Sequence, residues 1–267
     1  MGIPTPKGYS TLQEVKDYLD IENFTVEEAR VANVFLKAVE SMIESQTGGR
    51  VFVPTTTTLQ ADVDVSQTTL TVDSALARYP DSGVLLLEDE LVTYTGINET
   101  DTEPEVYTFT GLTRGEHGTT AAAHVAGVVP YLAKGFRGEN SSLYPGDFVE
   151  LITMWWNGAS TWSEISSTNY VAEPLQALPK QYINMGGEVL DTSLIYVAAV
   201  WGYADTTPYV IKVAAWRIFE ELWTRKGSPG GNIVDETVEG HRVKYADVSM
   251  IPADVTAMLD SYRRVQV

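Results

Sequence analysis

The chain has 267 residues, and 44% of them are hydrophobic, so it can bury the core of one large domain or two small ones. The 18 Lys and Arg residues face 36 Asp and Glu residues, which gives a formal net charge of −18. A surface of that charge repels phosphate groups. This excludes a protein that binds nucleic acid through contacts to the phosphate backbone. The absence of cysteine excludes disulfide scaffolds, thiolate zinc sites and cysteine nucleophiles.

Two amphipathic helices are predicted near the N-terminus. The first follows a capping-box pattern within residues 10–14 and ends near Asp20. The second follows the capping box of Thr25 and Glu28, and apolar residues then recur at helical spacing as far as Gly48-Gly49. Two helices joined by a few residues usually pack as a hairpin, so this pair needs a further surface to cover its apolar side.

Residues 50–133 change from helical to strand periodicity. Short apolar runs are separated there by clusters of Asp, Glu, Asn and Gly, which is typical of a small antiparallel barrel or sandwich. The segment has three basic and twelve acidic residues, a formal charge of −9. We interpret it as an all-β domain inserted into a host domain that comprises residues 1–49 and 134–267.

The rest of the predicted host domain, residues 134–267, begins with strands and ends with helices. Residues 148–152 and 194–200 are apolar runs of strand type. Pro208 opens an amphipathic helix that ends at Arg225, and Pro252 opens a last, short one. The expected fold class is α+β, with a helical core, a small antiparallel sheet and the inserted all-β domain.

The histidines and acidic residues give weak signals for metal binding. A metal at His117 and His124 would need further ligands that the sequence does not identify, so we interpret both as structural or surface histidines. Asp62, Asp64 and Ser66 alternate like the start of a calcium loop. That loop would need Gly at its sixth position and Glu at its twelfth, and both are missing.

No arrangement of residues predicts an enzyme. Neighbouring acids such as Glu220-Glu221, or Glu88, Asp89 and Glu90, are expected in a chain with 36 of them, and we interpret both groups as solvated faces. Residues 227–231 are rich in glycine but follow a helix, and they are typical of a turn. The sequence therefore predicts no catalytic site, no metal and no cofactor.

Tryptophans offer the best candidates for an interface. Trp155, Trp156 and Trp162 could stack on sugars or bases, but packing in a core or a subunit interface is the simpler interpretation. The candidate subunit-interface residues are Trp155, Trp156, Trp162, Trp216, Arg217 and Trp223.

Four motifs occur in a characteristic order. The first motif is Leu12-x-x-Val15-x-x-Tyr18-Leu19, and it precedes a helix that ends in Gly49-Arg50. Further along, a strand leads into Gly202-Tyr203 and then into a helix that begins at a proline. That helix is followed by the sequence Arg225-Lys226-Gly227-Ser228-Pro229-Gly230-Gly231. Residues 240–246 then precede a short helix that ends in Tyr262-Arg263-Arg264. In this order the motifs resemble the head-tail connector (adaptor) proteins of long-tailed phages and gene-transfer particles. The resemblance covers about residues 9–50 and 136–264.

The inserted segment departs from this pattern. Residues 87–96 and 110–120 are similar to a small β module that recurs in phage structural proteins. Connector proteins of this type generally lack the module, so its role is open.

The resemblance implies a structural virion protein that forms a ring, commonly twelvefold, under the portal of the capsid. Its partners would be the portal ring, a downstream stopper or tail-completion protein and further copies of the chain. Genomic DNA would pass through without specific binding, and no membrane would be involved. The implied location is the virion neck, after assembly in the host cytoplasm. An acidic wall suits such a conduit because it does not hold the phosphate backbone back.

Residues 251–267 are predicted to dock on the portal. Their helix is too short to be stable alone, so it needs a partner, and its basic end suits an acidic or carbonyl-rich surface. The alternative is that the helix packs back on its own domain. The candidate docking residues are Val255, Met258, Leu259, Tyr262, Arg263 and Arg264.

Two other function classes remain open from the sequence. A sugar-binding or accessory β-rich module of a phage tail or capsid would use the inserted segment and the tryptophans, and a glycan array would test it. A hydrolase is the third class, although no motif favours it.

Overall fold

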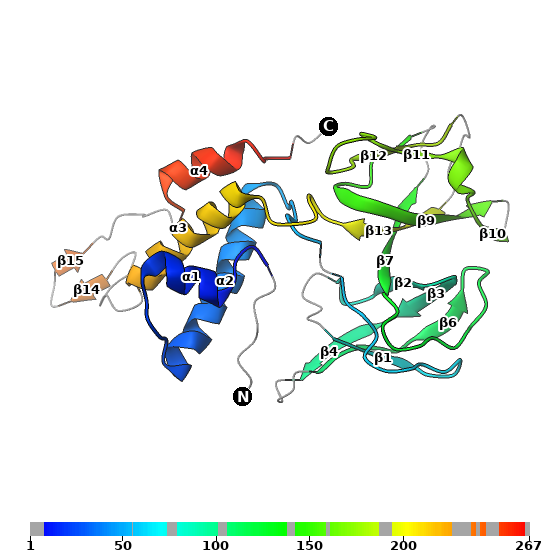
Figure 1. Cartoon of the computed structure of the whole chain (residues 1–267), viewed down its shortest axis with the longest axis horizontal. Coiled ribbons are helices and arrows are strands. Elements are labelled where there is room, and N and C mark those ends of the chain that lie inside the picture. The colour runs from blue at the N-terminus through cyan, green and yellow to red at the C-terminus, as the bar shows by residue number, and fades with distance from the viewer. Residues whose placement is uncertain are drawn as a thin grey trace. The chain divides into compact units, whose positions relative to one another are not determined.

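The computed structural model describes residues 8–54, 56–73, 79–100, 106–137, 142–158, 161–186, 194–225, 236–238, 241–243 and 251–264. The chain divides into two compact units (Figure 1). The helical unit contains Ile3–Arg50 and Thr207–Val267, and the β unit contains Val51–Thr206.

The helical unit takes its helices from both ends of the chain. They are α1 (Leu12–Leu19), α2 (Val26–Gln46), α3 (Tyr209–Arg225) and α4 (Ala253–Asp260), with a hairpin of β14 (Glu236–Val238) and β15 (His241–Val243). The predicted capping boxes are confirmed, because Thr11 and Thr25 each accept from the backbone three residues on. Gly48 and Gly49 both have positive φ and end the second helix as expected.

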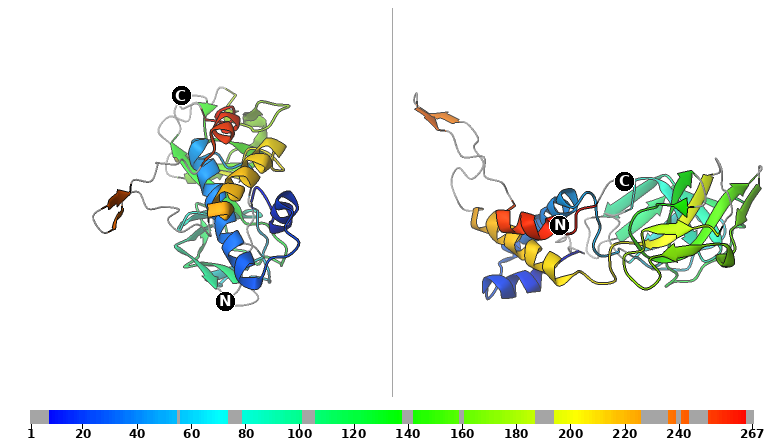
Figure 2. Two further views of the ribbon diagram at one scale, coloured as in Figure 1. Left: turned by 90° about the vertical axis from the view of Figure 1, so that its left-hand side faces the viewer. Right: turned by 90° about the horizontal axis from the view of Figure 1, so that it is seen from above.

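Packing in the helical unit centres on α2 and α3, each of which contacts the other three helices. In Figure 2, α1 and α3 lie on the same side of α2. The core comes from one face of each helix, and aromatic rings extend it where Phe35 meets Phe219 and Trp223. The fully buried apolar residues are Val15, Ala32, Leu36, Val39, Ile43, Ile211, Ala214, Ala215, Ile218, Phe219, Val255 and Leu259.

The β unit is built from thirteen strands among the described residues. They are β1 (Thr69–Val72), β2 (Gly83–Leu87), β3 (Glu90–Tyr94), β4 (Gly96–Thr100), β5 (Val106–Thr110), β6 (Thr113–Glu116), β7 (Tyr131–Arg137), β8 (Ser142–Leu143), β9 (Phe148–Gly158), β10 (Thr161–Glu164), β11 (Val171–Glu173), β12 (Tyr182–Asn184) and β13 (Leu194–Trp201). Seven form a curled antiparallel sheet in the order β10-β9-β13-β7-β2-β3-β6. Two smaller sheets, β1-β5-β4 and β11-β12-β8, accompany it.

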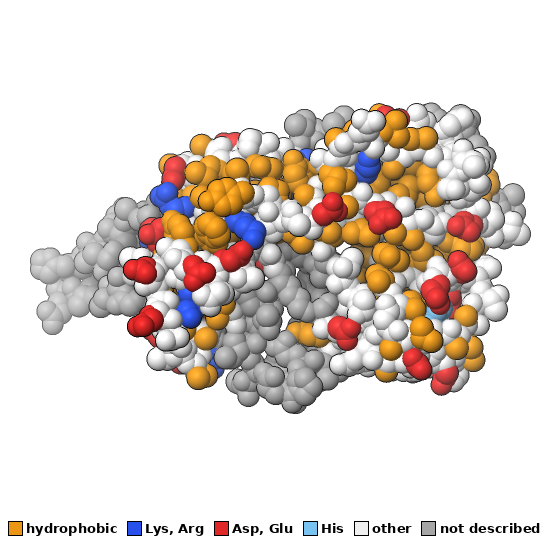
Figure 3. Space-filling model, in the orientation of Figure 1, with side chains coloured by type: hydrophobic (Ala, Val, Ile, Leu, Met, Phe, Trp, Pro, Cys, Tyr) orange, Lys and Arg blue, Asp and Glu red, His pale blue; other side chains and the backbone are white. Residues whose placement is uncertain are grey.

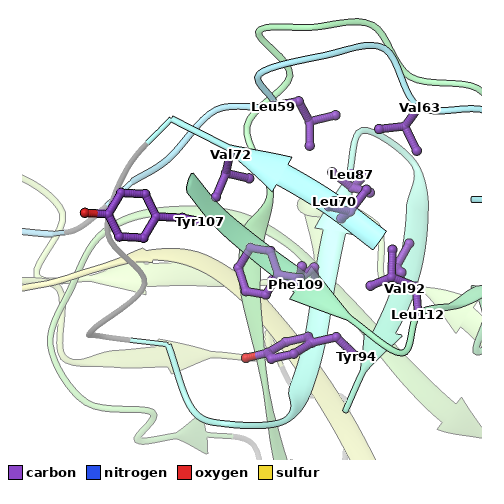
Figure 4. Packing of buried hydrophobic residues seen from close by; sticks show 11 residues of the cluster. Leu59, Val63, Leu70, Val72, Leu87, Val92, Tyr94, Tyr107, Phe109 and Leu112 are labelled. Carbon is purple, nitrogen blue, oxygen red and sulfur yellow. The ribbon is translucent and has the colours of Figure 1, made fainter. Parts of the chain in front are cut away.

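Separate apolar clusters lie on this framework. One joins the smaller sheet of β1 and β5 to β2 and β3, and the edge-to-face pair of Tyr94 and Phe109, with ring centres 4.8 Å apart, lies within it (Figure 4). A second joins β8 and β12 to β9 and β13. A third contains Val84, Leu86 and Leu91 together with Ala133 and Ala198, so it combines residues from both ends of the β unit.

The expected fold class is wrong. Strands make up 32% of the chain and helices 28%, and the largest element is the seven-stranded sheet. We predicted a helical core with a small sheet and a separate β insert. The structure instead shows a mostly β protein with one helical unit.

The division predicted between residues 133 and 134 falls inside β7. Residues 131–133 pair with β2, while residues 133–137 pair with β13. The strands on either side of that predicted division therefore belong to one sheet, whose pairing is non-local and leaves no trace in the local sequence pattern.

The segment that leads into the β unit and the segment that leads out of it lie next to each other. The backbone N–H of Tyr203 donates to the carbonyl oxygen of Val51 at 2.7 Å, and the ring of Phe52 lies 5.4 Å from that of Tyr203. Gly202 allows this approach, because a Cβ there would lie 2.8 Å from the backbone nitrogen of Pro54.

Candidate functional site

Three buried side chains and the exposed side chain of Glu88 form a cluster in the β unit, which we call the Glu90 network. Glu90 begins β3, Arg114 lies on β6, His124 lies in the segment between β6 and β7, and Glu88 lies in the turn between β2 and β3. The side chains of Glu90 and His124 are each 1% exposed and that of Arg114 is 7% exposed. Buried charges need partners, so the hydrogen bonds of the cluster decide what it does.

Both carboxylate oxygens of Glu90 are fully occupied. Oε1 lies 2.8 Å from Arg114 Nε and 2.8 Å from the backbone nitrogen of Gly115. Oε2 lies 2.8 Å from Arg114 Nη2, 3.0 Å from the backbone nitrogen of Ala122 and 2.8 Å from His124 Nε2. Five donors on one carboxylate leave no lone pair for abstracting a proton from a substrate, so this carboxylate cannot act as a general base.

These hydrogen bonds also decide the charge of Glu90. Burial by itself raises the pKa of its carboxyl group. The hydrogen bonds from Arg114, Ala122, His124 and Gly115 outweigh that effect and hold the pKa at about 2. The carboxylate is therefore ionised throughout the physiological range.

Arg114 connects the network to two further segments of backbone. Its Nη1 donates to the carbonyl oxygen of Asp64 and its Nη2 to that of Ala122, each at 2.6 Å. The guanidinium thus fixes β3, β6 and two loops in one arrangement. The chemistry of the Glu90 network is structural, and the interpretation of Glu88, Asp89 and Glu90 as a solvated face is wrong for Glu90.

The two candidate histidines lie in different surroundings. His124 belongs to the Glu90 network, whereas the ring of His117 packs against the rings of Trp162 and Tyr196, at 4.5 and 4.6 Å. Burial lowers the pKa of His117, and its Nε2 has no hydrogen-bond partner within the described part of the chain. His124 is buried and His117 is half-buried, and the interpretation of both as structural or surface histidines stays a prediction. In the described ranges no group of three or more His, Asp or Glu could hold a metal.

The remaining acidic candidates serve local structure. An oxygen of Asp62 accepts from the backbone of Ala126, and an oxygen of Asp64 accepts from the backbone and hydroxyl of Ser66. Residues 227–231 lie outside the described residues.

The acidic pair on α3 is split between two partners. Glu221 pairs with Arg225, and Glu220 accepts from the hydroxyl of Tyr18. Both are helix-surface contacts, which agrees with the solvated face that the sequence suggested.

The tryptophans of the β unit do not form one platform. Trp155 and Trp156 are neighbours on β9, so their side chains lie on opposite faces of the sheet. Trp155 packs on the cluster around Ala198 and Trp156 on the cluster around Met154. Trp162 stacks on Tyr196 at 5.4 Å. A stacking surface for a sugar needs adjacent, exposed rings, and this arrangement lacks them.

The two tryptophans of the helical unit are both half-buried, and each stacks on another ring. Trp223 stacks on the buried ring of Phe219 at 5.6 Å. Trp216 is half-buried, donates to Ser10 Oγ at 2.7 Å and stacks on the exposed ring of Tyr18 at 5.4 Å. The neighbouring side chain of Arg217 pairs with Asp254 at 3.1 Å.

The predicted docking helix is partly used within its own unit. Val255 and Leu259 are fully buried against the other helices, which corrects their assignment to a portal-docking surface. The chain after α4 is also bound, because the backbone N–H of Arg264 donates to the carbonyl oxygen of Thr47 at 3.0 Å. The short helix gains its order from packing back on its own unit, the alternative left open by the sequence.

The other predicted docking residues keep some exposure. Met258 and Tyr262 are half-buried, and the side chains of Arg263 and Arg264 are exposed. Arg263 Nε lies 3.4 Å from the carbonyl oxygen of Gln46. Portal docking through these four residues stays a prediction.

Truncation after Met250 is expected to destabilise the helical unit. It removes two fully buried side chains, those of Val255 and Leu259, each worth about 1.5–3 kcal/mol, so the free energy of unfolding should fall by about 3–6 kcal/mol. Chemical unfolding followed by circular dichroism at 222 nm measures this. A truncated chain of unchanged stability would show that α4 is an external docking element after all.

No described helix is both long and apolar enough to cross a membrane. No protein-family model matches the chain, and a comparison with curated proteins finds no match.

Proposed function

We propose that this chain is a structural virion protein, a head-tail connector (adaptor) that forms a ring through its helical unit. The connector-like motifs at residues 12–50, 208–231 and 240–264 support the proposal, because they lie together in the helical unit. Gly202-Tyr203 and the other residues of 136–206 that the resemblance covers belong to the β unit, so only residues 51–135 interrupt the connector pattern. No catalytic arrangement in the described residues competes with a structural role.

The observation that carries the proposal is a pair of unlike outer faces on the helical unit. The first, the aromatic face, lies on α1 and α3. Tyr209 is 72% exposed and Tyr18 39% exposed, and both rings contact Trp216, with centres 6.1 and 5.4 Å away. Figure 3 shows hydrophobic side chains gathered over α3 on this side. Aromatic side chains held by stacking in this way are typical of interface centres.

The second face, the cationic face, lies on α2. Val26 is 78% exposed and Val34 54% exposed, and the side chains of Lys37 and of Arg30, which lies 4.0 Å from the Glu27 carboxylate, are exposed beside them. These four recur at helical spacing, and the buried residues of α2 point the other way, toward α3. The cationic and aromatic faces are therefore on opposite sides of the α2–α3 pair.

Unlike faces on opposite sides of one unit suit head-to-tail association. A contact of the aromatic face of one copy with the cationic face of the next leaves one free face at each end of the chain of copies, and a ring closes when the rotation between copies allows it. A self-complementary dimer would instead need the same patch on both copies.

The distribution of charge favours the helical unit as the site of assembly. Its sequence has 16 acidic and 13 basic residues, a formal charge of −3, whereas Val51–Thr206 has 20 acidic and 5 basic residues, a charge of −15. Copies therefore repel one another through their β units and can approach through their helical units. The same negative charge suits a conduit that DNA passes without binding.

A mixing experiment tests head-to-tail assembly. Tyr209→Asp damages only the aromatic face and Val34→Asp only the cationic face. Each variant alone should lose the ring, whereas an equal mixture retains one intact interface and should form heterodimers. Native mass spectrometry measures the species, and circular dichroism checks that both variants are folded.

The outcomes separate the possible assemblies. A mixture that remains monomeric, or a wild-type chain that forms no ring alone or with a portal ring under the electron microscope, would overturn the proposal. A symmetric dimer of either variant would show that only one of the two faces is used.

A further inference from the structure

His124 in the Glu90 network faces two carboxylates at once. Its Nδ1 lies 2.7 Å from Glu88 Oε2, and its Nε2 lies 2.8 Å from Glu90 Oε2. A carboxylate oxygen only accepts hydrogen bonds, so both ring nitrogens have to donate. Only the imidazolium form, which carries a proton on each nitrogen, can do so.

The charge balance of the network leads to the same form. The groups that face the ring are Glu88, Glu90 and, through Glu90, Arg114, and they sum to one negative charge when the carboxylates are ionised. The carboxylates of the nearby acids have partners other than the ring, because Asp64 accepts from Ser66 and Asp62 accepts from the backbone of Ala126. A cationic ring brings the sum over these four groups to zero, and the exposed carboxylate of Glu88 supplies the charge that balances the ring.

His124 contacts three segments, the first two through its ring and the third through its backbone. Its Glu90 contact reaches β3, and its Glu88 contact reaches the turn between β2 and β3. The backbone of His124 exchanges two hydrogen bonds with Val63, at 2.8 and 2.9 Å, so a third segment is held as well. Glu88 has φ of +51°, a left-handed conformation that is unfavourable for a glutamate, and the contact with the ring helps to hold it.

The two carboxylates that contact the ring of His124 differ in exposure. The side chain of Glu88 is 57% exposed, whereas Glu90 is buried and keeps four other donors. If the ring lost one proton, one nitrogen would present a lone pair to a carboxylate, which is repulsive. The exposed contact can open to water at little cost, whereas the buried one cannot.

We propose that His124 is a proton-operated latch. With both ring protons present it holds the turn at Glu88, whereas the backbone hydrogen bonds between His124 and Val63 do not depend on these protons. Loss of the Nδ1 proton releases the turn at Glu88, while the pairing of Glu90 with Arg114 remains.

The protonation state can be read directly in the full-length chain. Nitrogen-15 NMR distinguishes an imidazolium, whose two ring nitrogens resonate close together, from a neutral ring, whose nitrogens resonate far apart. At pH 7 we expect the imidazolium pattern for His124, assigned by its loss in His124→Gln. A neutral ring in the wild-type chain at pH 7 would overturn the proposal without any variant having to fold.

A matched variant tests the release step. Glu88→Gln keeps the size of the side chain and can donate from its amide to a neutral Nδ1, so His124 no longer needs its second proton. Hydrogen exchange at residues 87–90 in the wild type should accelerate at least tenfold as pH rises and the ring deprotonates, after correction for intrinsic exchange. The variant should not show this acceleration, and Asp89→Asn, in the same turn, should behave like the wild type. Identical pH dependence in wild type and Glu88→Gln would overturn the latch.

Discussion

Glu90→Gln is expected to lower the free energy of unfolding of the β unit by about 3–5 kcal/mol, the usual cost of breaking a buried ion pair. The amide has nearly the shape of the carboxylate, so the loss comes from hydrogen bonding and charge. Its NH2 group would face at least two donors in either orientation, since two reach Oε1 and three reach Oε2. The guanidinium of Arg114 would also lose its ionic partner in a buried site.

Urea unfolding followed by tryptophan fluorescence measures the effect. Asp89→Asn is the matched control, because it makes the same chemical change on the adjacent, exposed side chain and should alter the stability by no more than about 0.5 kcal/mol. Equal stability of Glu90→Gln and Asp89→Asn would mean that the network is dispensable.

The lowered pKa of Glu90 also predicts how the free energy of unfolding of the wild type depends on pH, and the Glu90→Gln variant tests this. Folding lowers the pKa of Glu90 from 4.5 to about 2, so the folded state binds this proton less well than the unfolded chain does. The contribution to stability is complete above about pH 4.5 and is lost as the pH falls toward 2. Wild type should therefore lose more stability than Glu90→Gln over this interval, and parallel curves would contradict the assignment.

The helices are the part of the fold that the sequence predicted well. Capping boxes are local signals, and Thr11 and Thr25 begin their helices as expected. The helix after Pro208 also buries the predicted face around Ile211 and Ile218. These elements depend on neighbours three or four residues away, which a single sequence displays directly.

The sheet could not be predicted as a whole. The strand periodicity predicted within residues 50–133 is present, and β2 and β3 are two of the strands found there. The pairing of β2 with β7 joins segments about fifty residues apart, and nothing in either strand specifies its partner. The charge of the β region suggested a boundary at residue 133, although the acidic composition continues to residue 206.

The Glu90 network was missed because its members are far apart in sequence. Glu90, Arg114 and His124 are separated by 24 and 10 positions, and acids are so common in this chain that one of them attracts no notice. A usable signal existed at Arg114, because it is one of only three basic residues among positions 50–133. A basic residue in such an acidic β segment is a candidate for a buried ion pair, and Arg114 forms one with Glu90.

Deletion of residues 51–206 is expected to leave the helical unit folded. The chain crosses between units at Val51 and Tyr203, whose backbones are hydrogen-bonded at 2.7 Å, so a flexible bridge of about six Gly and Ser residues can replace the β unit. Its helices pack on one another through buried residues such as Leu36 and Ile218. The shortened chain should show a helical circular dichroism spectrum and a cooperative thermal transition, and on the proposed function it should still form rings.

Deletion of residues 51–133 alone, the segment that the sequence marked as a separate domain, should have the opposite result. It removes β1 to β6 and leaves Ala198 without Val84, Leu86 and Leu91 in its apolar cluster. Residues 134–137 would keep β13 as a partner, but the sheet would end in exposed apolar surface and an open edge, so aggregation is expected. Size-exclusion chromatography compares the two deletions. A soluble, folded product from the shorter deletion would place the domain boundary at residue 133, whereas an unfolded product from the longer one would show that the helical unit needs the β unit to fold.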